Sequence, residues 1–335
     1  MLDSMAGIGA PYSRTSVLET TAVTAIAPTT HRVPLVASLL AVSAGVVWAM
    51  GAVTVKLATH TDAWQYLIWR SIGVLVVMEI ISRIRGQGFM LPRAYNQGRR
   101  MLLGCCGLFL ASVAFIYALK NTTEANAVFL ASVTPICAVV LSRFFLGERL
   151  TKVTIGAIGL ALIGLFIIVA GDISGGNMAG NVAALLSSVG FAIYTVCVRS
   201  QPDRDWSPVL PGYAAMMIVI CATVTLVNGN TLAPPAKDMI YALIHGAVFI
   251  VIGTTLFNIG SRTVPAVPMT IFAQSETVFV PIFIFLRFAR TPKPSTLLGG
   301  AIIIAAIIGK AVLDSRPARV QQIEHSIEPG PGSIA

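Results

Sequence analysis

Long apolar runs separated by short polar linkers dominate this sequence. Each run is close to the ~20 residues that a helix needs to cross a ~30 Å hydrocarbon core. In lipid every backbone polar group must be satisfied within the segment, so apolar runs of this length favour helices. The pattern predicts an all-α polytopic membrane protein with ten transmembrane helices, at residues 34–57, 63–82, 101–119, 124–145, 153–171, 179–199, 209–228, 239–261, 265–287 and 295–313. The flanking segments, 1–33 and 314–335, are polar and punctuated by Pro and Gly, which predicts disordered tails.

Composition supports a membrane protein and excludes several other classes. The chain is 56% hydrophobic and 11% charged with a mean hydropathy of +0.81, whereas a soluble domain carries about 25% charged residues. The net charge of +9 arises from basic residues at the ends of apolar runs, so we expect membrane lipid and no nucleic acid as a partner. The five Cys and four His residues lack metal-ligand spacing, so we expect no metal and no cofactor.

The distribution of Lys and Arg at the run ends predicts an orientation. With the N-terminus in the cytoplasm, the opposite side of the membrane receives only Lys56, Lys120, Lys237, Arg287, Arg290 and Lys293. All the other basic residues except Arg70, which lies within a run, then fall on the cytoplasmic side. This bias predicts an inner-membrane protein with both termini in the cytoplasm.

The two halves of the chain resemble each other. A shift of 143 residues places Trp48 on Phe191, Lys56 on Arg199 and Ser132 on Ser275. The match predicts two five-helix repeats, at residues 34–172 and 173–313. Because five is an odd number, the second repeat must cross the membrane in the opposite direction. Such an inverted 5+5 repeat has two near-equivalent arrangements, as alternating-access carriers require.

The fourth and fifth runs carry a family resemblance. They contain Ala131-Ser132-Val133-Thr134-Pro135, then the turn Leu146-Gly147-Glu148-Arg149 and a Gly-rich run that begins near Gly156. This pattern, repeated in two halves, resembles the EamA family of the drug/metabolite transporter superfamily. The second copy departs from it, with Ala289-Arg290-Thr291 in place of a Gly-Glu turn. The resemblance implies a fold of ten spans and the transport of small metabolites.

Two charged residues lie deep within apolar runs. Burying Arg70 in lipid costs ~2.5–3.5 kcal/mol on insertion scales, so its side chain is expected to face a cavity or a partner. It is a candidate anchor for a substrate carboxylate or phosphate, or else a structural pair or a snorkelling side chain. Glu276 is a candidate ligand for a substrate amine or a proton relay, or else a structural hydrogen-bond acceptor.

Polar and aromatic residues of other runs complete the predicted substrate site. In an inverted repeat the site lies between the halves near the middle of the membrane, although each residue alone can equally serve packing. The further candidates are Trp48, Tyr117, Ser132, Phe191, Tyr194, Asn258 and Gln274.

These features favour a secondary transporter that moves a small metabolite, such as an amino acid or a similar amphipathic solute, with export as the expected direction. The chain has no Gly-rich phosphate loop followed by Lys and no catalytic constellation, so we expect it not to be an enzyme. Transport would then use a gradient, with proton coupling left open, in a monomer or homodimer. The alternatives are a membrane-embedded enzyme, which needs clustered catalytic groups, and a non-transporting bundle, which needs no inverted repeat.

Overall fold

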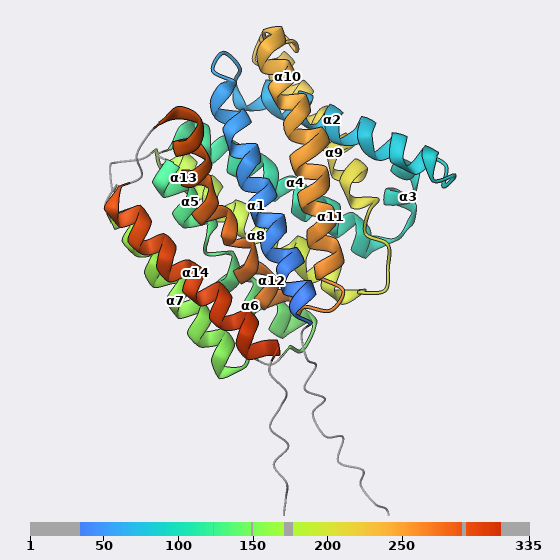
Figure 1. Cartoon of the computed structure of the whole chain (residues 1–335). Helices are drawn as coiled ribbons and strands as arrows, with labels where there is room; N and C mark the ends of the chain where they lie inside the picture. Colours follow the sequence, from blue (N-terminus) through green and yellow to red (C-terminus); the bar gives the residue numbers. More distant parts are fainter. Residues whose placement is uncertain (1–33, 123, 149, 171–176, 290–292, 316–335) are drawn as a thin grey trace, which may run out of the picture. The chain divides into compact units, whose positions relative to one another are not determined.

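The computed structural model describes residues 34–122, 124–148, 150–170, 177–289 and 293–315. All regular structure in these ranges is helical, with no strand (Figure 1). The predicted tails lie outside the described residues, except that the last helix continues to Ser315. The elements are α1 (Leu35–Leu57), α2 (Ala63–Ile84), α3 (Met90–Asn96), α4 (Arg99–Asn121), α5 (Glu124–Ala131), α6 (Thr134–Phe145), α7 (Lys152–Ala170), α8 (Met178–Ser200), α9 (Val209–Val227), α10 (Ala236–Ile244), the π-helix η1 (His245–Ile250), α11 (Val251–Gly260), α12 (Ala266–Ala273), α13 (Ser275–Phe288) and α14 (Pro294–Ser315).

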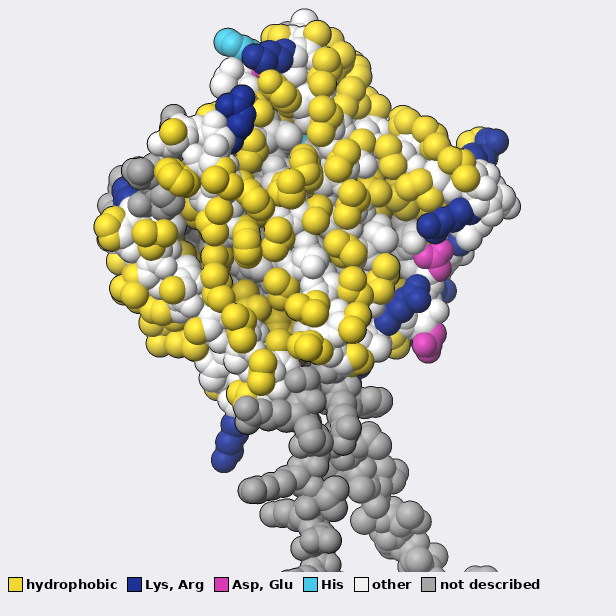
Figure 2. Space-filling view, viewed as in Figure 1, with side chains coloured by type: hydrophobic (Ala, Val, Ile, Leu, Met, Phe, Trp, Pro, Cys, Tyr) yellow, Lys and Arg dark blue, Asp and Glu magenta, His cyan; other side chains and the backbone are white. Residues whose placement is uncertain are grey.

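Many of these helices suit a membrane. Within the described residues, seven helical segments are long and apolar enough to span one: α1, α4, α8, α9, α10–α11, α12–α13 and α14. Shorter apolar helices lie at Thr134–Phe145 and Lys152–Ile168. Figure 2 shows hydrophobic side chains across the middle of one face, with Lys and Arg toward its borders. The prediction of an all-helical, multi-pass membrane protein is therefore confirmed.

Two runs that we predict as continuous helices, 124–145 and 265–287, are broken in the structure. The first divides into α5 and α6, with Pro135 in the first turn of α6 because proline lacks a backbone donor. The second divides at Gln274, where the hydrogen bonds tighten to the i−3 pattern. The Gln274 N–H donates to the carbonyl of Ile271, and the Thr277 N–H donates to that of Gln274.

The apolar pattern of the sequence does not predict two further features of the fold. The predicted run 239–261 contains the π-helical segment η1 between α10 and α11. The short helix α3 follows α2, and the Glu79 carboxylate of α2 accepts hydrogen bonds from the N–H groups of Met90 (2.9 Å) and Leu91 (2.6 Å). A carboxylate is favourable at a helix N-terminus, so Glu79 fixes the start of α3 rather than facing solvent.

Close helix pairs form the bundle. The helix α4 packs along α8, α7 along α14, α2 along α9, and α1 against both α11 and α13 (Figure 1). The α4–α8 pair approaches through Gly107 and Gly190: a Cβ at Gly190 would lie 2.5 Å from the backbone nitrogen of Ala111. Small residues at such crossings let backbones touch, which is how helices associate in lipid.

One residue just after α6 and one just after α13 adopt a left-handed backbone conformation. Gly147, after α6, has φ 65°, and Ala289, directly after α13, has φ 53°. Alanine pays a steric cost in this region that glycine does not.

Candidate functional site

A cavity of about 470 Å³ lies among the helices of both halves. In α1 and α4 its lining begins at Trp48 and Leu108 and continues to the C-terminal ends of the helices. Thr59 and Lys120, at these ends, are exposed and also line the cavity. The cavity therefore opens at the end of the bundle where α1 and α4 end.

Aromatic packing closes the inner end of the cavity. The ring of Trp48, 9% exposed, contacts Phe191 (centroids 5.7 Å apart) and Phe257 (5.5 Å). Tyr194 stacks on Phe257 at 5.7 Å. Toward the other end of the bundle, Arg199 at the end of α8 pairs with Glu148 (Nε to Oε1 3.5 Å). Access to the cavity is thus one-sided.

Arg70 is buried in the wall of this cavity without a compensating charge. Arg70 is 3% exposed, and its Nη2 donates to the Ser112 hydroxyl at 2.8 Å. Its Nε is buried without a hydrogen-bond partner, and no carboxylate of the described residues lies within 4.0 Å of the guanidinium. A buried cation with an unused donor that lines a cavity has the chemistry of an anion anchor.

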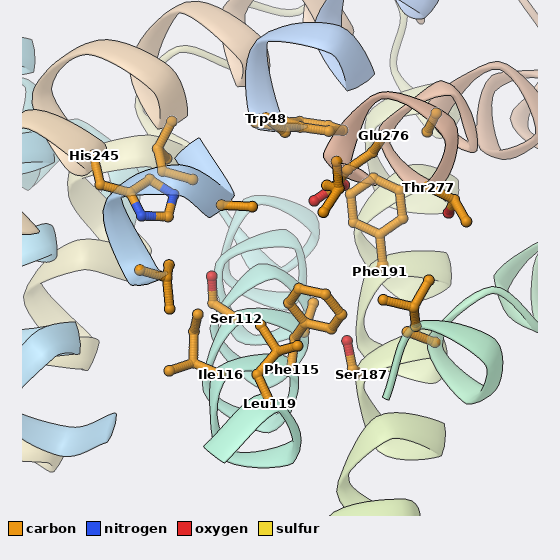
Figure 3. Close-up of a pocket in the computed structure, with 18 of the residues that line it drawn as sticks. Trp48, Ser112, Phe115, Ile116, Leu119, Ser187, Phe191, His245, Glu276 and Thr277 are labelled. Carbon is orange, nitrogen blue, oxygen red and sulfur yellow. The ribbon is translucent and has the colours of Figure 1, made fainter. Parts of the chain in front are cut away.

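Glu276 lies at the closed, aromatic end of the cavity. It follows the helix break at Gln274, and α1 packs directly against this break, since a Cβ at Gly45 would lie 3.0 Å from the Glu276 backbone nitrogen. Figure 3 shows its carboxyl group near Trp48 and Phe191. We find no hydrogen bond to the carboxylate in the described part of the chain. This group can therefore take a cation or a proton from the cavity.

Polar side chains connect the two helix breaks across the cavity wall. Gln274 Nε2 donates to the carbonyl of Ser132 (3.3 Å), and Thr277 donates to Gln274 Oε1 (3.1 Å). The Ser132 hydroxyl donates to the carbonyl of Val128 at 2.7 Å. These hydrogen bonds satisfy backbone and side-chain groups at the two breaks. Ser132 and Gln274 therefore stabilise the cavity wall.

The cavity gathers six of the nine residues that we predict for the site: Trp48, Arg70, Ser132, Phe191, Gln274 and Glu276. The other three lie outside its lining. Tyr117 packs against Trp64 (centroids 5.9 Å), and Tyr194, which is fully buried, donates its hydroxyl to Asn258.

Several lining residues were not predicted. Ser112, the hydrogen-bond partner of Arg70, lies inside an apolar run and carries no signal in the sequence. His245, which we treat as one of four scattered histidines, opens the π-helix η1 and lines the cavity (Figure 3). Its depth within the run 239–261 is the one signal that could have selected it.

A helical membrane bundle that encloses a cavity with buried charged groups has the architecture of a membrane transporter. The sequence model of the EamA-like transporter family matches this chain twice, over residues 15–170 and 178–310. The chain therefore belongs to the EamA-like transporter family, as the resemblance in its turn motifs predicts.

Named relatives are transporters as well. The chain is 28% identical to the pseudopaline exporter CntI of Pseudomonas aeruginosa, over 81% of this chain and 94% of the relative. It is 24% identical to a probable terminal-alkyne amino-acid exporter of Streptantibioticus cattleyicolor, over 66% of this chain and 75% of the relative. A crystal structure with 19% sequence identity shares the fold with a TM-score of 0.70, covering 84% of this chain and 99% of that one.

Proposed function

We propose that the chain is a secondary transporter of ten spans in an inverted 5+5 repeat, at residues 34–172 and 173–313. The helix contacts support this arrangement. In such a repeat α8 corresponds to α1, and α10–α11 correspond to α4. The contact between α4 and α8 then has its counterpart in the contact of α1 with α10–α11, and the α2–α9 and α7–α14 pairs each join two corresponding helices. The breaks near Ser132 and Gln274 occupy corresponding positions, and the family's sequence model matches each half separately.

The proposed orientation puts both termini in the cytoplasm of a cell with the protein in its inner membrane. Lys56 and Lys120 lie at the open end of the cavity, the end that receives few basic residues in our count. The opening then faces outward, and the Glu148–Arg199 end is closed toward the cytoplasm. Rocking one repeat against the other would expose the same cavity to the cytoplasm.

The proposed substrate is a small amphipathic metabolite that carries an anionic group. Arg70 holds this group, because it lines the cavity and, among the described residues, has no carboxylate partner and one donor, Nε, without a hydrogen bond. This is the observation on which the proposal rests most. Glu276 takes either a substrate ammonium group or a coupling proton, and apolar walls that include Trp48 and Phe191 accommodate the remainder of the solute. Export as the direction follows the names of the relatives.

A flux assay in reconstituted vesicles tests the proposal. Arg70→Met and Glu276→Gln are compared with Arg143→Met, a matched loss of charge at an exposed position near the end of α6. We expect both cavity variants to lose flux of amino acids while they still insert and fold, and the control to retain it. Glu276→Gln distinguishes the two roles of the carboxylate, because loss of a coupling site abolishes proton-driven accumulation but leaves exchange intact. Unchanged flux in both cavity variants would refute the site.

A further inference from the structure

The side chain of His245 faces the cavity from an unusual place in the backbone. The residue is 5% exposed and begins η1, the π-helical segment between α10 and α11. Figure 3 shows the imidazole ring at the edge of the cavity, on the side opposite Phe191 and Glu276. π-helical turns occur frequently at functional sites, because the extra residue re-aims the side chains of that turn.

A chain of hydrogen bonds determines which ring nitrogen carries the proton. The Thr54 hydroxyl donates to the carbonyl of Gly51 at 2.6 Å, which uses its only hydrogen. The Tyr66 hydroxyl, 3.0 Å from Thr54 Oγ1, must therefore be the donor in that pair. Tyr66 then has only a lone pair for His245 Nδ1, 2.8 Å away, so Nδ1 carries the hydrogen. The neutral imidazole is left with Nε2 as an acceptor.

Nε2 is available to a ligand. No hydrogen bond to this atom is found among the described residues. It lies close to α1 at a position without a side chain, since a Cβ added to Gly51 would be 2.7 Å from it. Because His245 lines the cavity, an acceptor on its ring that lacks a hydrogen-bond partner among those residues can bind a donor of the substrate.

The acceptor lies next to the anion anchor. The backbones of η1 and α2 touch at this point, because a Cβ on Gly246 would overlap the carbonyl oxygen of Arg70. The α2 helix also approaches α10 closely, since a Cβ on Gly73 of α2 would lie 2.5 Å from the carbonyl oxygen of Leu243 in α10. These contacts hold η1 against α2 at the level of His245 and Arg70, and both residues line the cavity.

We propose that His245 Nε2 is a subsite for an N–H or O–H donor that the substrate carries beside its anionic group. The inference rests on the proposed role of Arg70 and deepens it: the donor and the anion belong to neighbouring atoms of the solute, as in 2-amino and 2-hydroxy acids. Glu276, at the aromatic end, then lies beyond this pair and does not hold the same donor.

Three probes of similar size and apolar character test the subsite: leucine, 2-hydroxy-4-methylpentanoate and 4-methylpentanoate, which lacks the donor. Binding is measured with the purified full chain by tryptophan fluorescence. The wild type should bind the first two about ten- to a hundredfold more tightly than the third, as one hydrogen bond of a charged or hydroxyl donor in a cavity allows. His245→Leu should remove this preference and leave the affinity for 4-methylpentanoate unchanged. Gly51→Ala places a Cβ where the edge of the imidazole now lies, so the ring must shift, and this variant should reduce the preference in the same way.

The outcomes separate the subsite from the transporter proposal. Arg70→Met should weaken all three probes alike, whereas His245→Leu should change only their ratio. If His245→Leu and Gly51→Ala retain the wild-type ratio, or weaken the three probes equally, the subsite is refuted while the role of Arg70 stands. If the wild type binds none of the probes, the anion site of the proposed function fails, and the subsite fails with it.

Discussion

Replacing Arg70 by methionine distinguishes a functional charge from a structural one by the size of the loss in stability. Burying the guanidinium in a spanning helix costs ~2.5–3.5 kcal/mol, and the one hydrogen bond found for it in the described part of the chain, to Ser112, returns ~1.5–3 kcal/mol. Arg70→Met removes both terms and keeps most of the side-chain volume. The free energy of unfolding should therefore change by between about −0.5 and +2 kcal/mol, where a positive value is stabilising.

A structural ion pair would give the opposite result. Removing one partner of a buried pair costs ~3–5 kcal/mol, because the other charge is left uncompensated. Unfolding in detergent, followed by tryptophan fluorescence, measures the difference. In vesicles the same variant should lose substrate affinity roughly ten- to hundredfold, the equivalent of one hydrogen bond to a charged group.

Arg143→Met serves as the control for both measurements, since this exposed arginine lies outside the cavity lining. A loss of about 3 kcal/mol or more in Arg70→Met, with flux reduced only in proportion to the folded fraction, would refute the anchor. It would instead assign Arg70 to a pair outside the described residues.

Three further predictions, which use five variants, test the fold. Burial raises the pKa of the Glu148 carboxyl above its ordinary value, so its charged form opposes folding at neutral pH and this cost disappears as the pH falls through the folded-state pKa. Glu148→Gln should therefore be at least as stable as the wild type at pH 7, with the difference shrinking in unfolding curves recorded at acid pH; a variant that is less stable at pH 7 would contradict this. Ala289→Gly should stabilise the chain at the end of α13 by up to about 1 kcal/mol, whereas Gly147→Ala should destabilise the turn after α6 by about 1–2 kcal/mol, both measured by chemical unfolding. Gly190→Val should cost about 1–3 kcal/mol or more because the α4 backbone blocks its Cβ, and Gly156→Ala, which has open space around it, should have little effect on the same curves.

The sequence is sufficient to predict the helical membrane class and the two deep charges of the site. Both depend on a strong energetic rule, since charged side chains avoid lipid unless they serve a cavity or a partner. Arg70 and Glu276 stand out against apolar surroundings for this reason, and they line the same cavity in the structure. Family membership likewise follows from short turn motifs that end one span and begin the next.

The inward face of each helix could not be predicted. A spanning helix is apolar on its lipid side and on its packed side, so periodicity does not distinguish the two. Phe191 and Tyr194 lie one turn apart on α8, yet Phe191 lines the cavity while Tyr194 turns to Phe257 and Asn258. The cavity-lining position of His245 could not be predicted for a related reason. The direction of its side chain is set by a π-helical turn, which has no signal in the apolar pattern.

The hydrogen bonds in the cavity wall separate residues that hold the fold from residues that remain available to a solute. Irregular backbone is tolerated at membrane depth only where it is buried in protein or lines a cavity, and its freed groups need partners. Ser188 supplies a partner for the break after α5, since its one hydroxyl hydrogen lies within reach of the carbonyls of Leu130 (Oγ to O 2.7 Å) and Ala131 (2.8 Å). Gln274 does so across the two breaks. Ser188 and Gln274 are therefore engaged in holding the breaks, whereas Arg70 Nε and the Glu276 carboxylate, in the same wall, have no hydrogen-bond partner that we find among the described residues.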